Sequence, residues 1–291
     1  MNTPKKLQDI KVAVDAVVFG YFDKKDLQVL LIKRNIEPFK GGWALPGGLV
    51  LDDENLDDAV KRELYEEAGI KPDFLEQLYT FGNVGRDPRN RVVSVTYLGL
   101  VNPSYHNLSA DSDADDAQWF SVNGLPELAF DHKVIIDTAL KRLRTKIQYQ
   151  PIGFNLLTEE FPFSDLENLY KTIVGKEIDR RNFRKKMMSY GLLNETENVK
   201  KEGSGRPGKL FTFNQDKYKE LTDAATASGV NNLQIREQDN VLYIDGEATG
   251  DVKQQLWDIY EKLDPDYSSG DLMLNINSAA GVAEGTRLKV T

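Results

Sequence analysis

Residues 48–70 read GLVLDDENLDDAVKRELYEEAGI, and this stretch decides the fold of the N-terminal half of the chain. Its glutamates Glu63, Glu66 and Glu67 are three and four positions apart, so they share one face of a helix predicted from about Leu56 to Ala68. Like charges at this spacing destabilise a helix unless a cation neutralises them. Carboxylate oxygens suit Mg²⁺ or Mn²⁺, which leave positions open for phosphate oxygens. The stretch therefore predicts a metal-dependent site for a diphosphate.

The turn Pro46-Gly47-Gly48 precedes this helix. Glycine lets the backbone approach a ligand closely, so we expect the backbone of Gly48 to join the glutamates as a metal ligand. Arg62 is expected to point elsewhere and to pair with Glu54 or Glu63, which would hold the loop against the helix. Gly69 is expected to end the helix.

The general base has three candidates. Glu66 or Glu67 could take a proton from water, or an acid in the loop Asp111–Asp116 could do so.

The stretch matches the Nudix pattern G-x5-E-x7-R-E-U-x-E-E-x-G-U, where U is apolar, at every fixed position. It therefore resembles the Nudix hydrolases. The resemblance implies an α/β/α sandwich that cleaves diphosphates with magnesium. It also implies that the catalytic residues are Arg62, Glu63, Glu66 and Glu67.

A second resemblance follows the box. Residues 81–89 (FGNVGRDPR) and the strand-like Val92–Val95 are similar to the loop and strand of Nudix ADP-ribose pyrophosphatases and their ADP-ribose-binding relatives. Arginines on a turn could clamp a phosphate or a terminal ribose. Phe39 and Trp43 could stack an adenine, and core packing explains them equally well. The predicted ligand-binding residues are Arg86, Arg89, Trp43 and Glu54.

The rest of residues 1–147 has the pattern of a mixed fold. Strands are predicted at Lys11–Phe19, Leu27–Lys33, Phe74–Phe81, Val92–Val101 and Gln118–Val122, and a second helix at about His132–Lys146. Strands with two long helices predict a sheet covered on both faces. We therefore expect a Nudix domain over residues 1–147.

Residues 148–217 predict a winged helix-turn-helix domain. Ser164 and Glu167 form a capping-box signature for a short helix that Gly175 ends. Asp179 is expected to cap a second helix, which runs to Tyr190. A two-stranded wing is predicted around the loop Val199–Lys209.

This middle block is the only basic one, with 12 basic and 10 acidic residues. Basic side chains on the second helix and the wing fit a helix in the major groove and a hairpin on the phosphates. The predicted DNA-binding residues are Arg180, Arg181, Arg184, Lys185, Lys200, Lys201, Arg206 and Lys209.

The segments Asp179–Met187 and Gly205–Phe211 closely resemble the winged helix of Nudix-related transcriptional regulators. That family controls NAD metabolism in response to ADP-ribose, or sugar catabolism, and its members are typically homodimers on palindromic operators. The resemblance implies double-stranded operator DNA as a partner. Many members have a degraded box and bind ligand without cleaving it, whereas every box acid is present here.

Residues 218–291 predict a small acidic α/β module of unknown role. It holds 6 basic and 13 acidic residues, which argues against contact with DNA. Strands are expected at Leu233–Ile235, Val241–Ile244 and Leu272–Ile276, with a helix at Asp251–Leu263. Oligomerisation is one role that such a module could have.

Composition excludes several other classes. The chain has no cysteine, which rules out disulfides, zinc–thiolate sites and thiol catalysis. No apolar run has the length of a signal peptide or a membrane span, so we expect a cytoplasmic protein with no membrane partner.

The sequence as a whole favours an α+β, dimeric, DNA-binding regulator. Its Nudix domain would bind, and also hydrolyse, ADP-ribose or a similar nucleoside diphosphate sugar. One alternative is a magnesium-dependent Nudix hydrolase that uses the winged helix only for assembly. The other is a non-catalytic sugar or nucleotide sensor.

Overall fold

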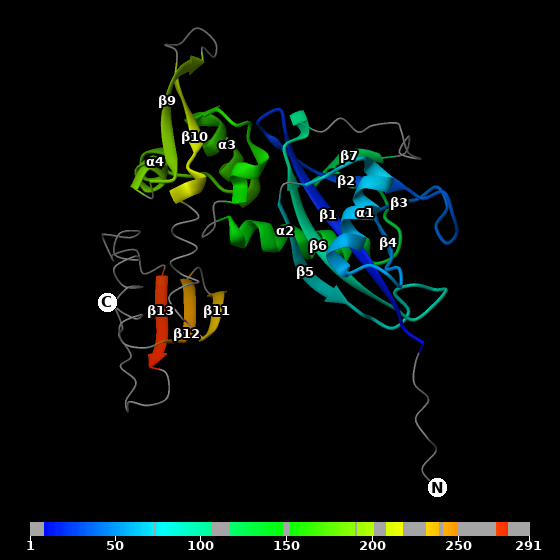
Figure 1. Cartoon of the computed structure of the whole chain (residues 1–291). Coiled ribbons are helices and arrows are strands. Elements are labelled where there is room, and N and C mark those ends of the chain that lie inside the picture. The colour runs from blue at the N-terminus through cyan, green and yellow to red at the C-terminus, as the bar shows by residue number, and fades with distance from the viewer. Residues whose placement is uncertain are drawn as a thin grey trace. The chain divides into compact units, whose positions relative to one another are not determined.

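The computed structural model describes residues 9–72, 74–105, 117–147, 152–189, 191–200, 208–217, 231–238, 241–248 and 272–278. The chain forms two compact units, residues 1–177 and residues 178–291 (Figure 1). The predicted Asp111–Asp116 loop and the predicted helix Asp251–Leu263 lie outside the described residues.

A seven-stranded mixed sheet forms the centre of the first unit. Its strands run in the order β3-β2-β1-β6-β5, while β4 pairs with β1 and β7 pairs with β2. β1 and β6 are parallel, and the other pairs are antiparallel. The strands are β1 (Lys11–Phe22), β2 (Asp26–Lys33), β3 (Trp43–Ala44), β4 (Gly47–Leu49), β5 (Phe74–Phe81), β6 (Val92–Val101) and β7 (Ala117–Ser121).

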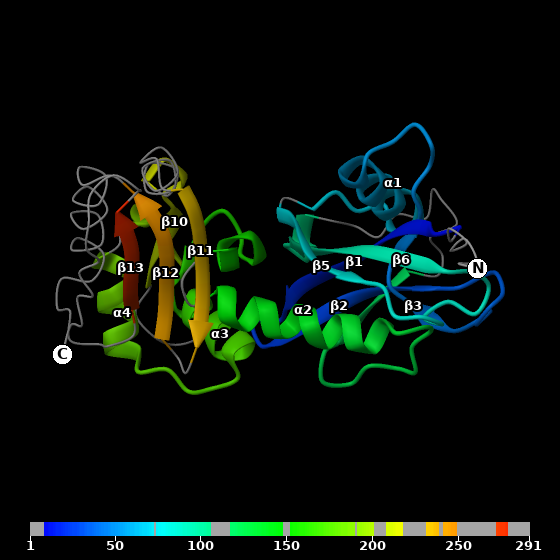
Figure 2. The same cartoon turned by 90° about the horizontal axis from the view of Figure 1, so that it is seen from below.

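Helices α1 (Leu56–Ala68) and α2 (His132–Lys146) cover opposite faces of this sheet (Figure 2). Alternate residues of a strand point to opposite faces. Val14, Ala16 and Val18 therefore face one way, and they form a core with the apolar side of α1. Asp15 lies between them and faces α2. The sheet covered on both faces is thus as predicted.

Local sequence sets the limits of α1. The side chain of Asn55 accepts a hydrogen bond from the backbone of Asp58 and caps the first turn. Gly69 adopts a left-handed conformation with φ 66° and ends the helix. The bounds of α1 and α2 match the predicted helices.

The first unit ends in α3 (Phe163–Val174), which is preceded by η1 (Pro103–Tyr105), η3 (Ile152–Leu156) and β8 (Phe161–Pro162). Gly175 ends α3 as predicted, with φ 73°. The capping-box prediction was wrong, because the helix begins at Phe163 and Ser164 lies in its first turn. Pro162 occupies the cap position, and no side chain caps the helix.

The second unit begins with α4 (Arg180–Ser189), and Asp179 caps it through a 2.8 Å hydrogen bond from the backbone of Asn182. Phe183 and Met187 are buried, while Tyr190, the predicted last residue of this helix, lies outside the described residues. An antiparallel hairpin follows, made of β9 (Leu193–Lys200) and β10 (Gly208–Phe213). Its strands are longer than predicted and include both ends of the predicted loop.

The C-terminal strands form a separate three-stranded sheet. β11 (Asn231–Gln238) is antiparallel to β12 (Val241–Ala248), which is parallel to β13 (Leu272–Ser278). Each strand is longer than its prediction. The architecture is therefore α+β throughout. In the part of the chain that the structure describes, no helix is both long and apolar enough to cross a membrane.

Candidate functional site

Arg62 organises the acidic box. Its Nε and Nη2 atoms donate to the two carboxylate oxygens of Glu54 at 2.9 and 2.6 Å. Its Nη1 atom donates to Glu63 at 2.8 Å and to Glu66 at 3.2 Å. The prediction that Arg62 holds the loop against the helix is confirmed, and the arginine contacts both predicted partners.

Glu54 also binds its own loop, where it accepts a 2.8 Å hydrogen bond from the backbone of Leu51. The hydrogen bond from Arg62 lowers the pKa of Glu54 to about 2. The same ion pair raises the pKa of Arg62. Glu54 is thus a structural support of the box in this conformation, and its predicted ligand contact stays a prediction.

Glu63 and Glu67 lie against the Gly47-Gly48 turn. A Cβ atom on Gly48 would come within 2.2 Å of Glu63 Oε1, so any larger residue there would displace this carboxylate. Glu67 Oε2 accepts a 2.8 Å hydrogen bond from the backbone of Gly47. The turn therefore brings two carboxylates from α1 against the backbone that precedes the helix.

Burial governs the protonation of these two acids. It raises the pKa of Glu67 to about 8, and the charge of Glu63 adds to the effect. Burial also raises the pKa of Glu63, although the bond from Arg62 opposes it. A nearby cation would relieve both costs.

The donors fit a hard divalent cation in kind, because Glu63 and Glu67 offer carboxylate oxygens beside the Gly48 backbone. The arrangement is nevertheless not a complete set of metal ligands. Across the residues with a described position, no three acidic or histidine side chains converge to hold a metal ion. Arg62 binds Glu63 and Glu66, and the side chain of Glu66 is 57% exposed. The ligand roles of Glu63, Glu66, Glu67 and Gly48 stay predictions.

The predicted ligand arginines are both paired with acids. Arg86 is buried and binds Asp131 through two hydrogen bonds of 3.0 and 2.8 Å, with Asp15 at 3.1 Å. Burial opposes its charge, but the bonds to Asp131 and Asp15 outweigh it and raise the pKa of Arg86. Arg89 forms a similar fork on Asp87, at 3.1 and 2.7 Å.

The two aromatic candidates differ in exposure, because Trp43 is half-buried and Phe39 is exposed. Trp43 packs edge to face on Phe120, with ring centroids 4.7 Å apart. Phe39 is 45% exposed and packs edge to face on Phe130 at 4.9 Å. Of the two, Phe39 is the one whose ring is left at the surface.

Sequence reasoning missed a buried polar network behind the box. Asp15 accepts a 2.5 Å hydrogen bond from Ser94, and His132 Nε2 lies 3.7 Å from Asp15 Oδ1. His132 Nδ1 accepts a 2.8 Å hydrogen bond from the backbone of Leu45. Burial lowers the pKa of His132, which favours its neutral form. An acid within the apolar run KVAVDAVVF was the signal that could have revealed this network.

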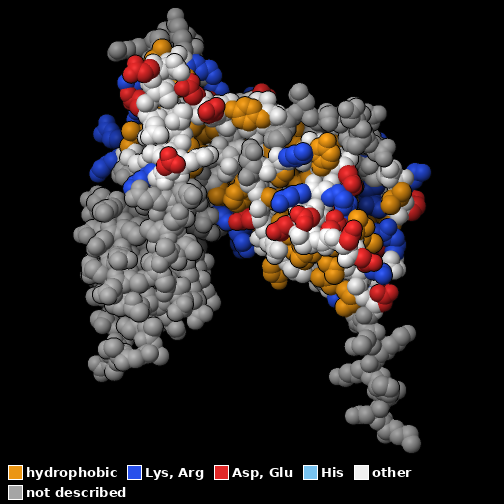
Figure 3. All heavy atoms as spheres, viewed as in Figure 1, with side chains coloured by type: hydrophobic (Ala, Val, Ile, Leu, Met, Phe, Trp, Pro, Cys, Tyr) orange, Lys and Arg blue, Asp and Glu red, His pale blue; other side chains and the backbone are white. Residues whose placement is uncertain are grey.

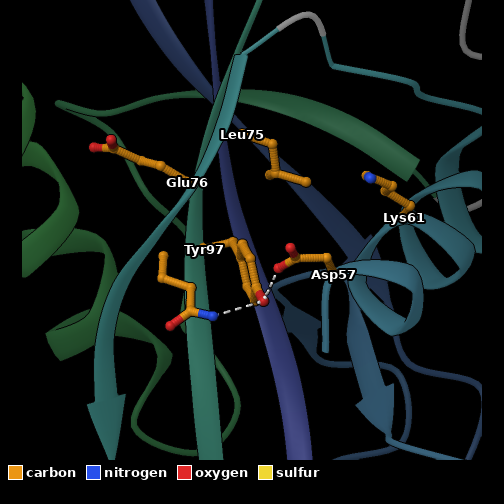
Figure 4. Close-up of a pocket in the computed structure, with 6 residues that line it drawn as sticks. Asp57, Lys61, Leu75, Glu76 and Tyr97 are labelled. Atoms are coloured by element: carbon orange, nitrogen blue, oxygen red, sulfur yellow. Dashed lines mark hydrogen bonds between the residues drawn. The ribbon is translucent and has the colours of Figure 1, made fainter. Parts of the chain in front are cut away.

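A separate hollow lies on another side of α1. It is lined by Asp57, Lys61, Leu75, Glu76, Gln77 and Tyr97 (Figure 4). Tyr97 donates a 2.5 Å hydrogen bond to Asp57 and accepts one of 3.2 Å from Gln77. Asp57, Gln77 and Tyr97 therefore bond one another, and Glu76 pairs with Lys146, so the box remains the better candidate site.

The basic residues of α4 form the second candidate site. Arg180, Arg181, Arg184 and Lys185 are exposed, and the guanidinium of Arg184 lies over the ring of Phe211 at 5.5 Å. Figure 3 shows basic side chains at α4, whereas acidic and basic side chains mix around α1. On the wing, Lys200 is exposed and Lys209 pairs with Glu195. Lys201 and Arg206 lie outside the described residues.

Two family models match the chain. Residues 10–139 match the NUDIX domain, and residues 153–213 match the NrtR DNA-binding winged helix domain. The chain is 34% identical over 211 residues to a protein of Acinetobacter baylyi called ADPR responsive transcriptional repressor NtrR, with 71% of this chain and 83% of that protein covered. The chain belongs to the NrtR family of regulators.

Two further likenesses refine this membership. The crystal structure of Shewanella oneidensis NrtR complexed with a 27mer DNA shares 34% identity at a TM-score of 0.65, covering 72% of this chain and 95% of that one. The ADP-ribose pyrophosphatase of Methanocaldococcus jannaschii is 42% identical over 125 residues, covering 43% of this chain and 70% of that enzyme. The Nudix domain of this NrtR-type chain is thus related to ADP-ribose pyrophosphatases.

Proposed function

We propose that this protein is a transcriptional regulator that binds operator DNA and responds to ADP-ribose or a related nucleoside diphosphate sugar. The observation that carries the proposal is the presence in one chain of an ordered acidic box and an exposed basic helix. The Acinetobacter relative, of which this chain covers 83%, is by its name an ADPR-responsive repressor. Assembly into a homodimer belongs to the same proposal.

We further propose that the Nudix domain hydrolyses its ligand. All four glutamates of the box are present, and Glu63 and Glu67 lie beside the Gly47-Gly48 turn. Mg²⁺ or Mn²⁺ bound there would neutralise charge on a diphosphate oxygen and lower the pKa of an attacking water. Arg62 would fix the position of Glu63, and Glu67 is the buried candidate for holding the reaction's proton.

One observation favours the non-catalytic alternative. Arg62 binds both Glu63 and Glu66, so cation binding has to compete with an existing ion pair. Hydrolysis must therefore be measured separately from binding.

Two assays test the proposal. Protein incubated with ADP-ribose and Mg²⁺ should release AMP and ribose 5-phosphate, and Glu67→Gln should lower the rate about 100-fold or more. Glu127→Gln, which changes an exposed acid, is the matched control. If Glu67→Gln and the parent protein give equal rates, or if neither gives product, the hydrolase proposal fails.

The second assay measures affinity for the DNA upstream of the protein's own operon, with and without ADP-ribose. We expect tight, salt-dependent binding that ADP-ribose changes by at least tenfold. A DNA affinity that stays the same when ADP-ribose is added would reject ligand-responsive regulation. Absent or salt-insensitive binding would leave a hydrolase whose winged helix serves assembly.

A further inference from the structure

Two arginines of the Nudix unit converge on one aromatic ring. The guanidinium carbon of Arg34 lies 4.8 Å from the centroid of Phe130, and that of Arg89 lies 5.9 Å from it. Phe39 packs against the same ring. Cations on an aromatic face are attracted to the ring but repel each other. We call Arg34, Phe39, Arg89 and Phe130 the arginine–phenylalanine cluster.

The cluster has more positive charge than its hydrogen bonds neutralise. Arg89 is forked on Asp87, whereas Nε of Arg34 donates to a backbone carbonyl, that of Pro38, at 2.8 Å. Nη2 of Arg34 is shielded from solvent and has no hydrogen-bond partner among the residues that the structure places. Such shielded N–H groups are nearly always bonded in folded proteins, so this one needs an explanation.

Arg34 also interacts electrostatically with the acidic box. It directly follows β2, and its charge acts on Glu67, which is itself bound to the Gly47 backbone. A ligand that reaches from the Glu63 and Glu67 carboxylates towards Phe130 would therefore pass from an acidic region to a cationic one. A diphosphate suits both regions, because one phosphate can share a cation with the acids while the other accepts from a guanidinium.

We propose that Arg34 is the residue that receives a phosphate oxygen of the diphosphate ligand, with Phe130 fixing the plane of its guanidinium. This inference rests on the proposed ligand class and moves the recognition of phosphate from Arg86 to Arg34. Arg86 already pairs with Asp131 and Asp15 through Nε and Nη2, so we infer that it positions the loop instead. The Arg34 side chain is only partly buried, so a small shift that keeps its guanidinium over Phe130 would present Nη2 to the ligand. Arg89 contributes less, because Asp87 already holds its charge.

The test compares Arg34→Gln, Arg34→Lys and the control Arg142→Gln. Arg142 lies on α2 and, among the residues with described positions, donates only to the backbone carbonyl of Leu78, at 3.4 Å. Calorimetric titration with inorganic pyrophosphate and Mg²⁺, and then with ADP-ribose, measures each affinity. We expect Arg34→Gln to bind both ligands at least 10-fold more weakly and Arg142→Gln to bind them normally. Arg34→Lys should recover part of the affinity, since it keeps the charge without the planar fork.

The outcomes separate the two proposals. If the parent protein binds pyrophosphate but not ADP-ribose, the proposed ligand is wrong while the Arg34 comparison still stands. If Arg34→Gln, or a folded Arg34→Lys when the first variant fails to fold, binds pyrophosphate and ADP-ribose as the parent does, the role of Arg34 is overturned. If the parent binds neither ligand, both proposals fall.

Discussion

Helices α1 and α4 are both densely charged, but their charges are used differently. The glutamates of α1 are held by Arg62 and by the backbone of Gly47, and two of them are largely buried. In α4, exposed basic side chains belong to Arg180, Arg181, Arg184 and Lys185, with the guanidinium of Arg184 over Phe211. Charged side chains that are positioned by partners within the protein are typical of a preorganised binding site. Charge displayed on a surface is suited to an external polyanion.

The largest effect is expected when exposed arginines of α4 are replaced. Arg181→Ala combined with Arg184→Ala should weaken binding to operator DNA about 100-fold, because lost phosphate contacts release fewer counterions. The slope of log affinity against log salt should become shallower by about 2. Fluorescence anisotropy across a salt series measures both. Hydrolysis and ligand binding should be unchanged, and equal loss of those activities would show misfolding instead.

A smaller effect is expected when the arginine that binds the α1 glutamates is replaced. Arg62→Met removes the fork on Glu54 and leaves Glu63 without its partner. We expect the free energy of unfolding to fall by about 1–2 kcal/mol, a modest value because the arginine side chain is 24% exposed. Denaturant unfolding followed by circular dichroism measures the change.

The same Arg62→Met variant should keep the operator affinity of the parent when it is folded. Arg142→Met, a matched change on α2, is the control for stability. A variant as stable as the parent would mean that the Arg62 network does not support the box.

The smallest effect concerns the wing. Lys209 already pairs with Glu195 across the hairpin, and exposed pairs of this kind stabilise a protein only slightly. Lys209→Ala should therefore change the free energy of unfolding by less than about 0.5 kcal/mol. It should lower operator affinity severalfold at most, whereas Lys185→Ala on α4 should lower it more. A larger loss from Lys209 in anisotropy titrations would make the wing, and not α4, the principal DNA contact.

Much of the fold was predictable from local signals. Gly69 and Gly175 end helices because a left-handed residue stops helix propagation, and both were correctly located. The limits of α1 and α2 followed from apolar spacing. The capping box at Ser164 failed because a matching pair of residues does not determine where a helix begins. The cap position went to Pro162 instead.

Within the site, the pairing of Arg62 was predictable because Glu54 and Glu63 are near it in sequence. Asp131 is 45 residues from Arg86, and Asp15 is 71, so no local sequence signal indicated that these acids would pair with the predicted ligand arginine. Arg34 was missed for the same reason, since Phe130 and Glu67 reach it only through the fold.

The sequence alone determined which chemistry residues 48–70 carry, and that a basic helix follows, because residue spacing on a helix fixes which side chains share a face. The tertiary structure alone decided which charges are already neutralised. It pairs Arg86 and Arg89 with acids, places Arg62 between Glu63 and Glu66, and leaves Nη2 of Arg34 without a hydrogen bond within the described residues. The physical reason is that ion pairing depends on distance in space, which chain order does not encode.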